Sequence, residues 1–265
     1  MTIKLYQDDH CLEANAQLLA IQENAFACDR TCFYPGGGGQ PPDDGSVILS
    51  DGNILGIASV QEDSEGCIWH AAKGSLPANL PGTTVRLAVN RERRIVFSRY
   101  HTVLHILNTI ALRDHAAWIT GAQIGTGYSR IDFRWDGFTP VLCGDLEAKV
   151  NAVIEANHSL RSFHLPEAEF AKRPDLLRTL EVKPPAVEGL VRVVAIEGFD
   201  EQACGGTHVS GTKELGRFSI FRTENKGRIN KRLYVRLESV HAGESASPRP
   251  DGPPKPACAT NDLEQ

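Results

Sequence analysis

Two pairs of side chains in this sequence have the types and spacing of metal ligands. His101 and His105 lie four residues apart, and Cys204 and His208 flank Gly-Gly-Thr about a hundred residues later. On a helix, the first spacing puts both imidazoles on one face, one turn apart. In the second pair, the glycines allow a sharp loop on which the thiol and the imidazole converge. Three imidazoles and a thiolate suit zinc, so we predict one zinc ion per chain.

The segments around these pairs indicate how they are positioned. An apolar stripe that includes Leu104, Leu107 and Ala111 predicts a helix over about 99–112, with Ser98 as its N-cap. A Val-rich stretch at 190–196 predicts a buried strand, and Cys204 follows it on a loop. Loops that follow rigid strands are common places for function.

The first ninety residues predict a small β-barrel or sandwich. Short apolar runs alternate with Gly, Pro, Asp and Asn, as all-β modules require. The glycine run 36–39 is interpreted from its composition as a tight connection between strands. The predicted strands cover 4–6, 13–22, 46–49, 54–60, 67–71 and 84–89.

The second part predicts an α+β sandwich. Its elements are strands at 130–135 and 190–196, a helix at 145–160, and an antiparallel pair at 218–222 and 233–237 with a turn at 225–228. The fold class is therefore α+β, with a barrel domain at 1–90 and a metal-containing domain at 91–240. Gly, Ser, Pro and Lys dominate 241–265, which we expect to be a disordered tail.

Composition restricts the class of protein. Of 265 residues, 41% are apolar and 23% charged, and the net charge is −5, which argues against a surface that coats nucleic acid but allows a local basic patch. No apolar run reaches membrane-spanning length, and the first residues lack a signal-peptide core, so we expect a cytoplasmic protein with reduced thiols. Cys28 and Cys32 are interpreted as small buried residues.

The motifs taken together resemble a known family. His-x-x-x-His and Cys-Gly-Gly-Thr-His are similar to the editing domain of alanyl-tRNA synthetases and of the freestanding AlaX-type editing proteins. The resemblance extends to the glycine motif Phe33–Pro41 with Asp44-Gly45, to the strand Arg130–Phe133 and to the hairpin Thr223–Gly227, and covers about residues 1–240. It implies a trans-acting hydrolase that removes serine, and sometimes glycine, from tRNA(Ala).

The resemblance also implies roles for particular residues. Water at the metal would attack the ester, so the four ligands are both metal-binding and catalytic, and the N–H groups of Gly205 and Gly206 are candidates for stabilising the oxyanion. A closed four-ligand set leaves open whether the metal activates water or positions the substrate. Candidate substrate-binding residues are Thr120, Gln123 and Thr207, and Glu197 and Asp200 are candidates for orienting an imidazole.

Basic side chains supply the candidate RNA contacts. The first group comprises Arg222, Lys226, Arg228, Lys231 and Arg232, and a second group comprises Arg91, Arg93 and Arg94. The expected partner is tRNA(Ala) mischarged with serine or glycine, and we expect no membrane and identify no protein partner.

Two alternatives remain open from the sequence. The chain could deacylate another aminoacyl-tRNA, because threonyl-type editing domains share the two ligand pairs. It could also be a non-catalytic, zinc-stabilised RNA-binding module.

Overall fold

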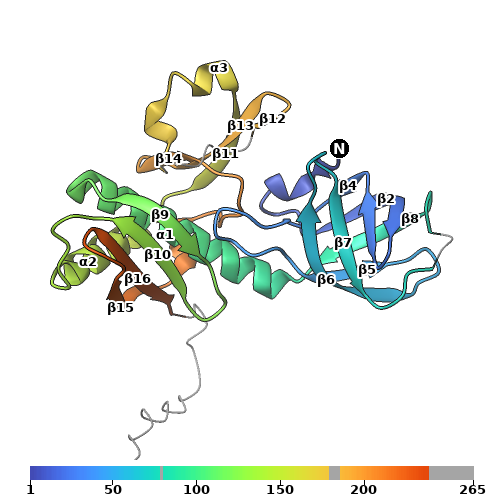
Figure 1. Ribbon diagram of the computed structural model, residues 1–265, viewed down its shortest axis with the longest axis horizontal. Coiled ribbons are helices and arrows are strands. Elements are labelled where there is room, and N and C mark those ends of the chain that lie inside the picture. Colours follow the sequence, from blue (N-terminus) through green and yellow to red (C-terminus); the bar gives the residue numbers. More distant parts are fainter. Residues whose placement is uncertain (78–79, 179–185, 239–265) are drawn as a thin grey trace, which may run out of the picture.

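A long helix, α1 (Arg91–His115), runs between the barrel and the other parts of the molecule (Figure 1). The computed structural model describes residues 1–77, 80–178 and 186–238. The helix begins earlier than predicted, because the Asn90 side chain accepts a hydrogen bond from the Arg93 backbone N–H and caps the first turn. The predicted N-cap, Ser98, is wrong: it is a buried residue inside the helix.

The amino-terminal strands close into a barrel, and the predicted α+β class with an N-terminal barrel is confirmed. The run predicted as a strand at 4–6 is mostly a 3₁₀ turn at Leu5–Gln7, preceded by β1 (Ile3–Lys4), which pairs with β4 (Arg30–Thr31). One barrel strand, β3 (Ala25–Cys28), was not predicted. The barrel order is β2 (Glu13–Gln22), β3, β7 (Ile68–Lys73), β6 (Ile54–Glu62), β5 (Gly45–Ile48) and β8 (Thr84–Val89).

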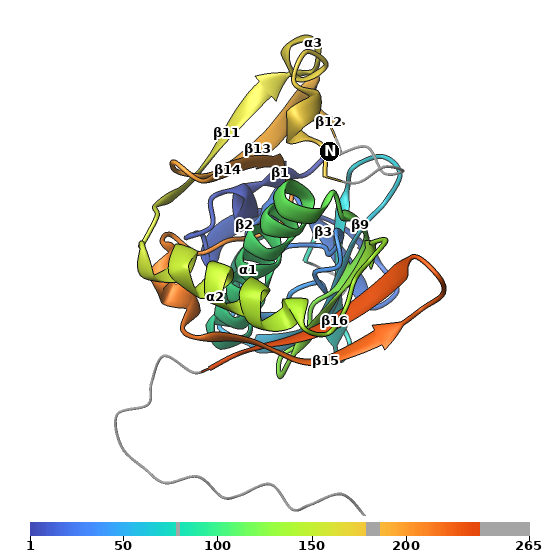
Figure 2. The ribbon, with the colours of Figure 1, turned by 90° about the vertical axis from the view of Figure 1, so that its left-hand side faces the viewer.

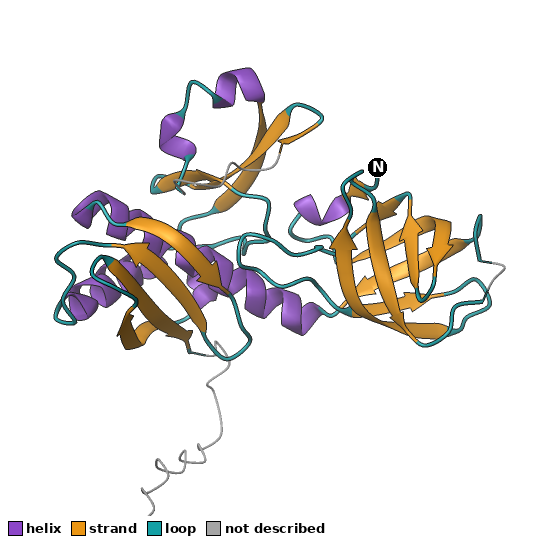
Figure 3. Ribbon diagram, viewed as in Figure 1, coloured by secondary structure: helices purple, strands orange, loops and turns teal. Residues whose placement is uncertain are grey.

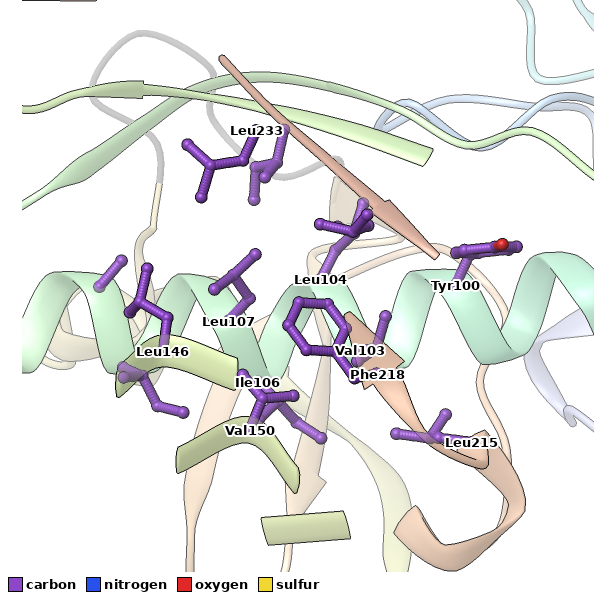
Figure 4. Close-up of a cluster of buried hydrophobic side chains, with 14 of the residues drawn as sticks. Tyr100, Val103, Leu104, Ile106, Leu107, Leu146, Val150, Leu215, Phe218 and Leu233 are labelled. Atoms are coloured by element: carbon purple, nitrogen blue, oxygen red, sulfur yellow. The ribbon is translucent and has the colours of Figure 1, made fainter. Parts of the chain in front are cut away.

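A second sheet packs against α1 and α2 (Leu142–Glu155). Its order is β15 (Phe218–Asn225), β16 (Asn230–Leu237), β10 (Ser129–Arg134) and β9 (Trp118–Gln123), so β9 is an edge strand. The view in Figure 2 shows both helices on one side of this sheet. The apolar stripe of α1 is buried as predicted, and Figure 4 shows Leu104 and Leu107 between Leu233 of the sheet and Leu146 of α2.

The remaining strands form a third unit (Figure 3). β13 (Leu190–Ile196) pairs with β11 (Leu160–Pro166), β12 (Ala186–Val187) and β14 (Asp200–Ala203). This strand therefore lies in a different sheet from the late hairpin β15–β16, a separation that the sequence did not indicate. Short helices complete the chain: α3 (Glu167–Phe170) and the 3₁₀ turns Pro174–Leu176 and Thr212–Leu215.

Two further expectations can be compared with the structure. Cys28 and Cys32 are fully buried as predicted, and burial raises the pKa of each thiol to about 12. None of the helices in the described part of the chain is both long and apolar enough to cross a membrane. The predicted tail at 241–265 lies outside the described residues.

A buried ion pair connects α1 to the glycine-motif loop. Arg94 and Asp43 have almost no exposed surface, and the Arg94 guanidinium donates to both Asp43 carboxylate oxygens and to the Cys32 carbonyl at 2.7 Å. The same carboxylate accepts the Tyr34 backbone N–H at 2.7 Å. The pair fixes the loop against the first turn of the helix, and it removes Arg94 from the candidate RNA contacts.

We expect Arg94→Met to destabilise the protein strongly, because it leaves the Asp43 carboxylate buried without its partner charge. Breaking a buried pair in this way costs about 3–5 kcal/mol, which urea unfolding at neutral pH would measure. The matched control is Arg86→Met, which removes the exposed partner of Glu13 on the barrel surface and should change the midpoint little. Equal effects of the two substitutions would contradict this account.

Candidate metal centre and cavity

The four predicted ligands come together at one point. His101 and His105 project from α1, and Cys204 and His208 lie on the loop after β14. Their four ligand atoms all lie within 4.8 Å of one another. The Cys204 Sγ atom is 3.4 Å from His101 Nε2 and 3.4 Å from His208 Nε2.

This arrangement fits a zinc ion. Tetrahedral bonds to nitrogen and sulfur place neighbouring ligand atoms about 3.4–3.6 Å apart, which matches the two Cys204 distances. Three imidazoles and a thiol are also the borderline-soft donors that zinc prefers over the carboxylates and carbonyls that hold magnesium or calcium. The cluster therefore has the donor set and the close approach that a metal ion requires.

The pKa values of the ligands keep the imidazoles neutral, so that each ring has a nitrogen lone pair available for a metal. In the metal-free protein, burial lowers the pKa of His105 to about 3 and holds those of His101 and His208 well below the ordinary histidine value. Burial acts in the opposite direction on the Cys204 thiol, whose pKa it raises to about 11. Three neutral imidazoles are thus ready to coordinate, whereas the thiol releases a proton on binding a metal.

Gln40, from the glycine motif, fixes the orientation of His101. Its Oε1 lies 2.7 Å from His101 Nδ1 and also accepts the Thr207 backbone N–H at 3.1 Å. Because a backbone N–H can only donate, the Thr207 contact identifies this end of the amide as the oxygen, and the Gln40 Nε2 then donates to Thr207 Oγ1 at 2.9 Å. His101 Nδ1 must then carry the proton, and Nε2 keeps its lone pair for the metal.

His208 is oriented in a similar way from α1 itself. Thr102 Oγ1 lies 3.0 Å from His208 Nδ1, and His208 Nε2 points toward Cys204. The Asp9 carboxylate accepts the His208 backbone N–H at 2.9 Å and forms an ion pair with Arg192 at 3.1 Å.

Arg192 fixes the backbone of the ligand loop. This buried side chain of β13 donates to the carbonyls of Cys204 at 3.1 Å and Gly206 at 2.8 Å. The loop is thereby tied to the third unit through β13 and to the amino-terminal segment through Asp9.

Two glycines are required by close approach. A Cβ on Gly206 would lie 2.1 Å from His101 Cε1, so no other residue fits without displacing the ligand. A Cβ on Gly39, whose φ is +86°, would lie 2.5 Å from the Ala122 carbonyl oxygen of β9. The glycine motif is therefore more than the predicted tight connection, because it also packs against the second sheet.

The cluster opens onto a cavity of about 860 Å³. His105 and Cys204 are half-buried, whereas His101 and His208 are buried, so the accessible side of the cluster is the side of His105 and Cys204. The walls come from the glycine motif, from α1, from β9 and from the third unit. They include Tyr34, Gly36, Leu104, Asn108, Ile119, Ala122, Leu190 and Gln202.

Three predicted substrate contacts do not fit this geometry. Thr120 and Gln123 are exposed residues of β9, and Ile119 and Ala122 of that strand line the cavity instead. Thr207 is fully buried behind the metal ligands, where its hydroxyl meets Gln40 and Ser98. It positions the loop and does not reach the cavity.

One of the two predicted oxyanion donors is also corrected. The Gly206 N–H points to the Cys204 sulfur at 3.4 Å, so it stabilises a thiolate and is not directed at a substrate. Gly205 lines the cavity, and its N–H stays a candidate.

The predicted carboxylates near the loop have other partners. Asp200 binds Arg113, Arg178 and Gln202, and Gln202 in turn donates to the His105 carbonyl at 3.2 Å. Glu197 forms an exposed ion pair with Arg161. Neither carboxylate contacts an imidazole of the cluster.

The hairpin cations differ in how accessible they are. Arg222 and Lys226 are exposed beside Glu224, and Arg228 is exposed at the turn. Lys231 is buried and donates to the carbonyls of Gly227 and Arg228, and Arg232 pairs with Asp132 at 2.6 Å. In the second group, Arg91 is exposed, while Arg93 donates to the Pro42 carbonyl and Arg94 is buried.

The sequence comparisons agree with the motifs. The family model described as tRNA synthetases class II (A) matches residues 2–93, and the model of the threonyl and alanyl tRNA synthetase second additional domain matches residues 191–234.

Individual relatives match over nearly the whole chain. The alanyl-tRNA editing protein AlaX-M of Saccharolobus solfataricus is 32% identical over 241 residues, which cover 90% of this chain and 100% of that protein. The AlaX-M protein of Methanosarcina acetivorans is 34% identical over 89% of this chain and 99% of its own length. An alanine–tRNA ligase from Korarchaeum cryptofilum is 36% identical over 82% of this chain, but only 24% of that ligase is matched.

We expect Gln40→Leu to weaken zinc binding about 10–100-fold, the usual effect of removing a partner that orients a metal-bound histidine. Competition of the purified protein with a chromophoric chelator would measure the affinity. Gln123→Leu, an exposed glutamine on β9, is the control and should bind zinc like the wild type. Unchanged affinity of a folded Gln40→Leu protein would refute the role assigned to Gln40.

Proposed function

This chain belongs to the AlaX-M family of alanyl-tRNA editing proteins, and from that premise we propose that it hydrolyses the ester of tRNA(Ala) mischarged with serine or glycine. A pocket shaped for alanine discriminates poorly against serine, which adds only a hydroxyl, so a second site must destroy the wrong product. The observation that carries the proposal is the four-ligand cluster at the wall of a large cavity.

The cavity has a suitable size and composition for an aminoacylated end. Its volume of about 860 Å³ lies in the upper part of the range for small-molecule sites and leaves room for a nucleotide beside an amino acid. Apolar walls from Leu104, Ile119 and Ala122 meet polar groups from Asn108 and Gln202 near the cluster. The amino acid would lie against the cluster, with the ribose and base toward the glycine motif.

The protein side chains have distinct tasks in this proposal. His101, His105, Cys204 and His208 would hold zinc, which when bound supplies Lewis-acid polarisation of the ester carbonyl or of a water. Gln40 and Thr102 keep the two buried imidazoles in the orientation for coordination. The substrate approaches from the half-buried side formed by His105 and Cys204, and the Gly205 N–H donates to the developing oxyanion.

Asn108 is the residue that we assign to the serine hydroxyl. Asp200 holds Gln202 Nε2 at 2.7 Å, and Gln202 Oε1 accepts from Asn108 Nδ2 at 3.5 Å. This chain of contacts leaves Asn108 Oδ1 buried without a hydrogen-bond partner among the described residues. Because a buried unpaired acceptor costs free energy, a hydroxyl that reaches it gains a bond that the hydrogen of glycine cannot make.

Two other functions remain as outcomes of the test. A threonyl-type deacylase would act on threonyl-tRNA in preference to seryl-tRNA. A non-catalytic module would bind zinc and RNA and hydrolyse no ester.

We expect purified protein to contain about one zinc per chain and to release serine from seryl-tRNA(Ala), with slower release of glycine. Cys204→Ala should lower turnover by at least about a hundredfold, because it removes one ligand from the centre that polarises the ester. Cys143→Ala, which changes a half-buried cysteine of α2 far from the ligands, is the matched control. Near-normal turnover of Cys204→Ala, or hydrolysis of none of the seryl, glycyl, alanyl and threonyl substrates by the wild type, would refute the proposal.

We expect Asn108→Ala to change selectivity between substrates. Loss of a hydrogen bond to the serine hydroxyl should lower kcat/KM for seryl-tRNA(Ala) about tenfold or more, equivalent to about 1–3 kcal/mol. The kcat/KM for glycyl-tRNA(Ala) serves as the internal control and should change far less. Equal losses for both substrates would assign Asn108 a purely structural role.

A further inference from the structure

The second sheet has one face that neither helix covers. Inward residues of β10 and β16, such as Ile131 and Leu233, pack on α1 and α2, and the alternate residues point to the other side. Figure 1 shows this other face in front of both helices.

Three aromatic rings form a cluster on the uncovered face. Tyr128, Phe221 and Tyr234 have ring centroids 5.9–6.1 Å apart. Tyr128 is 50% exposed and Phe221 is 44% exposed, which is unusual for large rings in contact with one another. Their open surfaces can still stack on a further flat group.

Arginines surround the aromatic cluster. Arg222 lies 4.8 Å from the centroid of the Tyr234 ring, and Arg236 lies 4.6 Å from that of the Phe221 ring. Cross-strand pairing places Arg130 beside Tyr234 and Tyr234 beside Arg222 in one row. We name this surface the aromatic–arginine face; its residues are Tyr128, Arg130, Phe221, Arg222, Tyr234 and Arg236.

The charge of this face opposes that of the whole chain. The protein carries −5 overall, yet Arg130, Arg222 and Arg236 are concentrated here with Arg232. Asp132 and Glu224 are the carboxylates among them, and each is shared by two cations: Asp132 by Arg130 and Arg232, Glu224 by Arg222 and Lys226. A local positive field on an acidic protein indicates a polyanionic partner.

The face is joined to the cavity through β9 and the loop that follows it. Ile119 and Ala122 of β9 line the cavity, and Gln123 of the same strand accepts from Arg130 at 2.9 Å on the outer side. The loop to Tyr128 begins at Ile124, whose N–H binds the Gly39 carbonyl at 2.8 Å. A chain that enters the cavity past the glycine motif can therefore continue onto this face.

We propose that the aromatic–arginine face binds RNA of the substrate adjacent to its acylated end, with arginines on phosphates and an unpaired base stacked on Tyr128 or Phe221. The inference rests on the proposed function, which makes RNA the partner. Aromatic rings beside basic groups are the usual platform for single-stranded nucleic acid. A second copy of this chain fits less well, because a two-fold contact would press the same arginines against each other.

The test measures binding of uncharged tRNA(Ala) by fluorescence anisotropy over a range of salt concentrations. Tyr128→Ala with Phe221→Ala should weaken binding about tenfold or more and leave the salt dependence unchanged. Arg222→Gln with Arg236→Gln should weaken binding and also reduce the slope of log K against log salt by about 1–2. Tyr128→Phe, which keeps the ring, should retain wild-type affinity.

A matched control comes from another sheet. Arg161 lies 4.9 Å from the ring centroid of Phe163 on β11, so Arg161→Gln removes a comparable arginine–aromatic pair and should not change tRNA affinity. If both double variants bind within about twofold of the wild type, the RNA surface is refuted. It is also refuted if the variants change only self-association in sedimentation.

Failure here can be separated from failure of the proposed function. The face variants should keep the wild-type kcat at saturating seryl-tRNA(Ala) and raise KM, because they touch none of the metal ligands. A wild type that hydrolyses its substrate while the variants keep wild-type KM and Kd refutes only the surface. A wild type that binds tRNA through this face but cleaves no ester refutes only the hydrolase.

Discussion

The centre depends on one amide that contacts both the helix and the loop that carry the ligand pairs. Gln40 accepts from His101 on α1 and both accepts from and donates to Thr207 in the loop that carries Cys204 and His208. Since Gln40 itself comes from the glycine motif, the three parts of the chain meet at a single side chain. The ligands can only converge when the barrel loop, the helix and the late loop are all in place. The buried Arg94–Asp43 pair holds the same glycine-motif loop against the first turn of α1. Arg94 therefore affects the geometry of the cavity although it does not line it.

Burial gives this centre its chemical character. Burial favours the neutral form of all four groups: lowered pKa values keep the three imidazoles unprotonated, and a raised pKa keeps the proton on the thiol until a divalent ion displaces it. The side chains that orient the imidazoles, Gln40 and Thr102, are neutral, and the nearby charges of Asp9 and Arg192 pair with each other, so the charge of the ion would be offset mainly by the thiolate. The Gly206 N–H directed at that sulfur stabilises the charged form.

The sequence predicted the convergence of these four side chains because the spacing within each pair is local. An i, i+4 pair on a helix and a Cys-x-x-x-His loop after a buried strand require little knowledge of tertiary structure, and the barrel strands at 13–22 and 84–89 were similarly evident from turn residues. The orienting residues were missed, because Gln40, Asp9 and Arg192 lie far from the ligands in sequence and have no distinctive spacing. The third unit was missed because β13 alone does not reveal which strands flank it.

A bulge in β9 decides which of its side chains face the cavity. Strict alternation from Ile119 would put residues 119, 121 and 123 on one face, but the pairing with β10 skips Thr120, so Ile119 faces Phe133 and Gly121 faces Asp132. This bulge places Ile119 and Ala122 together on the cavity wall and turns Thr120 and Gln123 outward. One inserted residue thus gives the strand two different sides: its apolar side lines the cavity, and its polar side lies beside the aromatic–arginine face. The same bulge turns Gln123 away from the cavity and places it beside Arg130, where the RNA is proposed to lie.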